Sequence, residues 1–250
     1  MPRTTIFEWT FEPKDFFEDP LALSDGACSV VSTPGVVEAR ISPEGAGETK
    51  FARQSMHEFV LNHFRGHQLV SRRRYKLSEP RHVEIDESGK RHAFLYPESA
   101  TFTFSVQPAD FVVRASDGSI ISDSRAERIA RKRDLSAMIQ SRIGVDPILR
   151  RILSSYELSI SDDANELIHL YEIRDALQVR YGTSEKARKA LAITKSDWKK
   201  LGDLANKHPI KQGRHRGQHL VLRDATEQEL STARSIAVSL IEAYLHHASA

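Results

Sequence analysis

The chain has 250 residues, of which 40% are hydrophobic, enough to bury a core in one large or two ordinary domains. Its formal net charge is only +2 with 28% charged residues, which excludes a polyelectrolyte that binds nucleic acid or an acidic membrane with its whole surface. A single cysteine, Cys28, excludes an intramolecular disulfide. We also find no signal peptide and no apolar run of the ~18–20 residues that span a membrane, so we expect a cytoplasmic protein with no membrane partner.

The first half of the chain alternates between apolar and polar residues, as is typical of strands with one buried face. Phe7, Trp9 and Phe11 share one face of the first predicted strand, which ends at Pro13. A helix is predicted over residues 54–64, with Met56, Phe59, Val60 and Phe64 on its inner face. Further strands are predicted at 36–41, 82–85, 92–95, 102–106, 111–114 and 119–121, the last two joined by a tight turn at Asp117-Gly118.

After Ser122 the apolar period becomes that of helices. Asp146-Pro147 suits a helix start, and Gly144 and Gly182 suit helix ends. The sequence therefore predicts an α+β fold, in which a β-rich domain over residues 1–122 precedes an all-helical bundle over residues 123–250. The expected helices cover 124–143, a segment beginning at 147, 163–181, 184–192, 196–206 and a last helix after 226.

The last predicted helix has the clearest pattern in the sequence. Thr226 and Glu229 form a capping box, and an apolar stripe follows at Leu230, Ala233, Ala237, Leu240 and Tyr244. We expect this stripe to pack on the 163–181 helix, which carries Leu170, Leu177 and Tyr181 at matching positions. The length of the stripe also predicts a homodimer formed through the helical half.

The strongest functional signal is the segment Arg214-His215-Arg216-Gly217-Gln218-His219. Arginine offers a planar fork of donors that matches phosphate oxygens, and histidine is the side chain whose ordinary pKa lies nearest working pH. Such residues could hold a phosphodiester and move protons around it. A solvated basic loop made mobile by Gly213 and Gly217 is the alternative interpretation.

The spacing Arg214, four residues, His219, with polar His215 directly after the arginine, resembles the Arg-x4–6-His motif of HEPN domains. Residues 164–245, with Leu170-Tyr171-Glu172-Ile173-Arg174-Asp175-Ala176-Leu177, Trp198, Leu201 and Ala205-Asn206, are similar to the HEPN domains of ApeA-like defence proteins. HEPN domains are helical bundles, often dimeric, and many are ribonucleases of prokaryotic defence and toxin systems. The resemblance covers the helical half only.

The resemblance implies a metal-independent endoribonuclease that needs no cofactor. His219 would activate a ribose 2′-hydroxyl or protonate the leaving oxygen, Arg214 would neutralise the phosphate, and His215 is the third candidate catalytic residue. HEPN domains often place a polar residue opposite the motif, and Glu172 or Arg174 would fill that place. One departure is that residues 220–225 separate this motif from the last helix, whereas the family motif usually begins a long helix.

Two other functions fit the sequence. The helix pair over 184–206 resembles a helix-turn-helix in spacing, and Lys195, Lys199 and Lys200 could reach DNA phosphates, which would make the protein a DNA-binding regulator. The helical half could instead be a catalytically silent dimerisation module beside a β domain that binds a ligand or a partner protein.

Several basic residues are candidates for contact with nucleic acid. Arg216 belongs to the motif segment, and two further patches contain Arg72, Arg73 and Arg74 in the first half and Arg131 and Lys132 after Ser122. A solvated strand end and a solvated helix face are the alternatives for those two patches.

Other enzyme classes lack their usual motifs. The sequence has no Gly-rich dinucleotide or nucleotide loop, no His-Glu-x-x-His and no Gly-x-Ser-x-Gly. His63 and His67 have the i, i+4 spacing of a metal pair, but Gly66 between them weakens the helix and no third ligand follows. We therefore expect no metal site.

Overall fold

The computed structural model describes residues 5–24, 28–41, 49–85, 91–93, 110–115, 117 and 119–247. The chain divides into two compact units, Met1–Ser136 and Ala137–Ala250. A β-sheet forms much of the first unit and helices form the second, so the predicted α+β class with a helical C-terminal half is confirmed.

The N-terminal unit contains an antiparallel sheet with the strand order β2-β3-β4-β1-β6-β7 among the described residues, and β5 also pairs with β1. The predicted strands at 36–41 and 82–85 are confirmed. Pairing of the latter strand with residues 91–93 is confirmed too, whereas residues 94–95 and the predicted strand at 102–106 lie outside the described residues. The strands are β1 (Thr5–Glu12), β2 (Ala22–Ser24), β3 (Cys28–Thr33), β4 (Val36–Ile41), β5 (Lys76–Leu77), β6 (Arg81–Ile85) and β7 (Arg91–Ala93).

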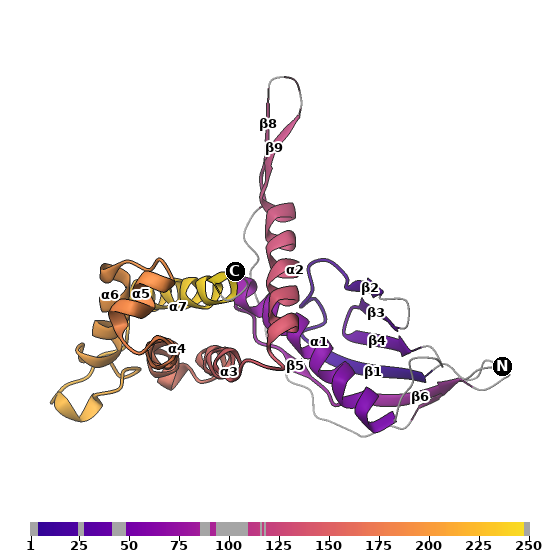
Figure 1. Cartoon of the computed structure of the whole chain (residues 1–250), viewed down its shortest axis with the longest axis horizontal. Helices are drawn as coiled ribbons and strands as arrows, with labels where there is room; N and C mark the ends of the chain where they lie inside the picture. Colours follow the sequence, from indigo (N-terminus) through magenta and orange to yellow (C-terminus); the bar gives the residue numbers. More distant parts are fainter. Residues whose placement is uncertain are drawn as a thin grey trace. The chain divides into compact units, whose positions relative to one another are not determined.

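The core of this unit lies between the sheet and α1 (Thr49–Ser71), which crosses one face of the sheet (Figure 1). Phe7, Trp9 and Phe11 are all buried, as the alternation predicts. Val60 and Phe64 of α1 are buried against them, and the ring centroids of Phe64 and Phe11 lie 5.4 Å apart. The helix is longer than the predicted 54–64, and the predicted inner face is the one that packs on the sheet.

The predicted hairpin after residue 110 is confirmed as β8 (Val112–Arg114) and β9 (Ile120–Asp123), which leads directly into α2 (Ser124–Arg142). The first part of α2 packs closely against α1 in the N-terminal unit. A Cβ atom at Gly66 of α1 would lie only 2.6 Å from the backbone nitrogen of Ser136. Gly66 thus permits close packing of two helices. The predicted boundary at 122 marks the change from strands to helices, whereas the compact unit continues to Ser136.

The C-terminal unit is a helical bundle in which α4 contacts α3, α5, α6 and α7. Asp146 caps α3 by accepting hydrogen bonds from the backbone nitrogens of Ile148 and Leu149, and α4 ends at Gly182, as predicted. The elements are α3 (Pro147–Ser161), the 3-10 turn η1 (Asp163–Asn165), α4 (Glu166–Tyr181), α5 (Ser184–Ala190), α6 (Lys195–Asn206), the 3-10 turn η2 (Arg216–Gln218) and α7 (Glu227–His247).

The last helix confirms its predicted start and packing. Thr226 and Glu229 form the capping box, with 2.9 Å from the Thr226 nitrogen to Glu229 Oε2 and 3.2 Å from the Glu229 nitrogen to Thr226 Oγ1. Ala233, Ala237 and Leu240 are buried inside the unit, where α7 contacts α4 and α6. Because this stripe is covered within one chain, it gives no support to the predicted homodimer. No helix in the described part of the chain combines the length and the hydropathy of a membrane-spanning segment.

Candidate functional site

The segment between α6 and α7 forms a closed loop whose two ends are joined. Residues Ile210 and Arg223 form a parallel bridge, with 2.9 Å from the Lys211 nitrogen to the Arg223 carbonyl oxygen. Arg223 also makes a two-pronged ion pair with Glu229 at 2.6 and 2.7 Å, and this pair holds the pKa of Glu229 at about 2. The basic segment 214–219 therefore lies in a loop whose two ends are held together by hydrogen bonds and an ion pair.

The side chain of Arg214 extends from this loop to α4. Its backbone nitrogen donates to the carbonyl oxygen of Ala205 at 2.7 Å, and its Nη1 lies 3.2 Å from Asp175 Oδ2. The guanidinium carbon lies 4.8 Å from the centroid of the Tyr171 ring, within the range of a cation–π contact. Side-chain exposures of 40% for Arg214 and 43% for Asp175 leave the pair open to solvent and to a ligand.

Arg174 shares the same tyrosine. Its guanidinium carbon lies 4.9 Å from the Tyr171 ring centroid and 5.1 Å from that of Trp198 on α6. Two guanidinium groups thus contact one aromatic ring, and Asp175 is the carboxylate that pairs with Arg214. The structure therefore brings the predicted residues Arg174 and Arg214 together. Sequence reasoning gives Tyr171 no role of its own, although its position three residues before Arg174 indicates a shared helix face.

The two histidines of the motif are placed differently from Arg214. His215 is exposed, and the side chain of Gln218 lies 3.4 Å from its Nδ1. His219 follows η2, and its Nε2 is buried without a hydrogen-bond partner among the described residues. Within the fully described range 119–247, no hydrogen bond or ion pair joins Arg214 to His219. Arg214 is thus held against Asp175, whereas the described residues offer His219 Nε2 no partner.

Arg216 fastens the loop to the start of α4. Its Nη2 donates to the carbonyl oxygen of Ala164 at 2.8 Å and to Asn165 Oδ1 at 2.5 Å, and its Nε donates to the carbonyl oxygen of Gly213 at 3.1 Å. These donors serve the protein itself. Arg216 is thus placed as a positioning residue for the loop, in contrast to the phosphate-binding role predicted from the sequence.

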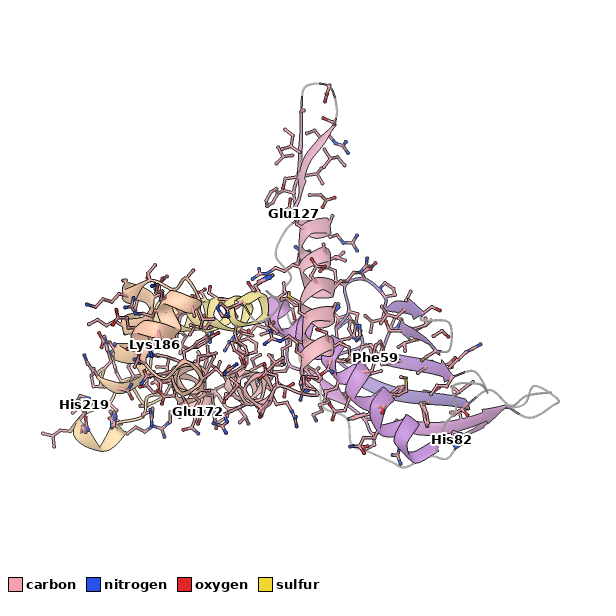
Figure 2. All side chains as sticks on the ribbon, viewed as in Figure 1. Phe59, His82, Glu127, Glu172, Lys186 and His219 are labelled. Carbon is pink, nitrogen blue, oxygen red and sulfur yellow. The ribbon has the colours of Figure 1, made fainter. Side chains whose placement is uncertain are left out.

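Glu172 contacts other residues than those around Arg214. It accepts a hydrogen bond from Ser155 at 3.0 Å and lies 3.4 Å from Nδ1 of His169, so it faces α3 and its own helix. Figure 2 shows Glu172 on α4 and His219 on the outer loop, well apart from each other. Of the two supporting residues predicted on α4, Arg174 is therefore the one that shares the Tyr171 ring with Arg214.

The basic patches of the N-terminal unit are partly internal. Arg73 pairs with Asp15 at 2.6 Å, and Lys132 is only 3% exposed with its Nζ 2.7 Å from Glu18 Oε2. Arg72 is half-buried, with a positive φ of 53° directly after α1. Arg74 and Arg131 are exposed. Lys132 consequently belongs to the interior of the unit, and the accessible basic surface is smaller than the sequence indicates.

The described residues contain no group of three or more His, Cys, Asp or Glu side chains arranged to hold a metal ion. His63 and His67 lie on α1, where His67 is buried against Phe16 and Phe17. Burial lowers the pKa of His67 to about 3, so its imidazole is neutral at physiological pH.

Comparison of the chain with protein-family models, with curated proteins and with solved structures finds no match.

Proposed function

We propose that the C-terminal unit is a metal-independent endoribonuclease of a prokaryotic defence or toxin system and acts as a homodimer. Arg214 binds the scissile phosphate, and His219 either activates the ribose 2′-hydroxyl or protonates the leaving oxygen. His215, exposed in the same loop, is the neighbouring donor to RNA.

The observation that carries the proposal is the setting of Arg214. Its guanidinium is aligned by the Tyr171 ring and paired with the half-exposed carboxylate of Asp175. Solvent-exposed ion pairs contribute only ~0.2–1 kcal/mol, so an RNA phosphate can displace Asp175 at little cost. The aromatic face then keeps the planar fork of donors in place for the phosphate oxygens.

In this proposal a second copy of the chain completes the site. His219 of one chain would approach Arg214 of the other, as the resemblance to dimeric HEPN domains implies. Leu220 and Val221, which directly follow His219, are almost fully exposed. Burying these two apolar side chains between copies would favour a contact at the motif itself, in place of the α7 stripe.

The test compares RNA cleavage by the wild-type protein with that by Arg214→Ala, Arg214→Lys and His219→Ala. We expect losses of about 10²- to 10⁴-fold for His219→Ala, with unchanged thermal stability and only partial rescue by Arg214→Lys. Products should end in a 2′,3′-cyclic phosphate, and excess chelator should not stop the reaction. His246→Ala, which removes an exposed histidine at the end of α7, is the matched control.

Mixing Arg214→Ala with His219→Ala tests the composite site. Each heterodimer would keep one intact site, so about a quarter of wild-type activity should return when the copies exchange freely. Sedimentation over a concentration series should show the dimer. Wild-type rates in His219→Ala, or a reaction restored only by a divalent metal, would contradict the mechanism.

DNA regulation is the second candidate, since α5 and α6 have helix-turn-helix spacing. Both helices pack on α4, and α6 also packs on α7 and buries Trp198, Leu201 and Leu204. Lys199 and Lys200 are both exposed, and Lys199 is already paired with Asp203. Charge reversal at Lys199 and Lys200 should abolish salt-dependent binding of duplex DNA if this function holds, and should leave RNA cleavage intact.

A further inference from the structure

A pocket of about 330 Å³ lies between α4, α5 and α6, outside the Arg214–His219 loop. Its size falls at the lower end of the range of small-molecule sites. Neither Arg214 nor His219 lines it. The charged residues around it are Arg174, Arg188, Lys195, Lys199, Lys207 and Asp203, that is, five cations and one anion.

Arg174 lines this pocket, and the described residues offer its guanidinium no hydrogen-bond acceptor. The rings of Tyr171 and Trp198 contact its guanidinium, and its Nε is buried with no partner among the described residues. A Cβ atom at position 202 would collide with its Nη1, so Gly202 makes room for the guanidinium. Arg174 lines the pocket together with Gly202, so a ligand oxygen that reaches its Nη atoms would gain a charge-assisted hydrogen bond.

The single acidic residue at the pocket does not neutralise the remaining cations. Lys199 and Lys207 both pair with Asp203, the latter at 2.8 Å, and these contacts hold the pKa of Asp203 at about 2. Asp203 therefore stays ionised and is occupied by two lysines. Arg188 and Lys195 have no ion pair in the described part of the chain, so the mouth of the pocket keeps a positive potential.

We infer that this pocket binds the phosphate monoester of a nucleotide or of an RNA end. A dianionic phosphate offers the acceptors that the Arg174 fork lacks, and it balances Arg188 and Lys195 better than a single carboxylate would. The polar side chains of Ser184 and Asn206 also line the pocket and can contact a ribose. This inference does not rest on the proposed ribonuclease activity.

Calorimetric titration tests the site with four probes: inorganic phosphate, AMP, adenosine, and a short 2′-O-methyl oligonucleotide with or without a 5′-phosphate. The 2′-O-methyl groups prevent attack by the 2′-oxygen, so failure of the ribonuclease proposal would not affect the result. We expect phosphate and AMP to bind, and adenosine to bind at least about tenfold more weakly than AMP. Preference for the phosphorylated oligonucleotide over AMP would assign the site to an RNA end, and the reverse would assign it to a free nucleotide.

Two variants and one control separate the pocket from diffuse charge. Gly202→Ala should displace the Arg174 guanidinium and weaken AMP binding about 10- to 100-fold, while the helical circular dichroism signal stays unchanged. The double variant Arg188→Gln/Lys195→Gln, which changes a half-buried and an exposed residue, should give a similar loss. Lys200→Gln removes an α6 charge that does not line the pocket and should stay within about twofold of wild type. No binding of phosphate or AMP to the wild-type protein, equal binding of AMP and adenosine, or an equal loss in Lys200→Gln would overturn the inference.

Discussion

Replacing Glu18 by glutamine should destabilise the N-terminal unit. The Glu18 carboxylate joins the segment after β1 to α2, where it accepts hydrogen bonds from Lys132 at 2.7 Å and from the Nε of Arg128 at 3.0 Å. Its side chain is 10% exposed and that of Lys132 is 4% exposed. Glu18→Gln would leave the Lys132 ammonium buried beside an uncharged amide.

The size of the effect follows from the pKa of Glu18. Hydrogen bonding from Arg128, with a further contribution from Lys132, lowers this pKa from 4.5 to about 2. At ~1.4 kcal/mol per unit, this shift corresponds to at most ~3 kcal/mol. Breaking a buried pair by removing one partner typically costs ~3–5 kcal/mol, so we expect Glu18→Gln to lower the free energy of unfolding by about 3 kcal/mol at neutral pH.

The effect should depend on pH in one direction. Because the folded-state pKa is lower than the unfolded one, the stabilisation is complete above about pH 5 and is lost as the pH falls from 4.5 toward 2. The difference in stability between wild type and Glu18→Gln should therefore shrink over that range.

Urea denaturation followed by the fluorescence of Trp9 measures this unit, since Trp9 is fully buried in its core. A Trp198→Phe background removes the only other tryptophan. Asp19→Asn is the matched control, because its partner Arg133 is 63% exposed and the pair should contribute less than about 1 kcal/mol. Equal destabilisation by both substitutions, or a wild-type-to-variant difference that is independent of pH, would refute the reasoning.

Two further outcomes concern the C-terminal unit. Arg216→Ala should speed hydrogen exchange of the 213–219 amides, since the Arg216 guanidinium donates to Ala164, Asn165 and Gly213. The salt dependence of RNA binding should stay unchanged. A slope of log affinity against log salt concentration that falls by about one would instead reveal a phosphate contact. Thr226→Ala should lower the free energy of unfolding by about 1 kcal/mol through loss of the α7 cap, measured by Trp198 fluorescence, and an unchanged stability would show that the capping box contributes nothing.

Much of the fold was predictable because its signals are local. The capping box before α7, the proline after Asp146 and the alternation of β1 all act within a few residues. Strand β3 was missed because its pattern misleads. Ser32 is buried there and its Oγ accepts a hydrogen bond from the Leu21 nitrogen at 2.8 Å, whereas the apolar Val31 is exposed.

The site was predictable only in part, since its contacts join distant segments. The sequence places Arg214 in a basic run, but its pairing with Asp175 depends on how the loop folds back over α4. Lys132 also stands in a basic run, and nothing near it in the sequence indicates Glu18 as its partner. Residue type and local spacing indicate which side chains can bind phosphate, whereas tertiary packing decides which of them remain accessible.

The close contact between Gly66 and Ser136 bears on how the protein can be dissected. A fragment that ends at Ser122, where the strands give way to helices, would lose the part of α2 that packs on Gly66. It would expose apolar surface on α1 and would tend to aggregate. A fragment that ends at Arg142 keeps α2 whole and is the better starting point for separating the sheet from the helical bundle.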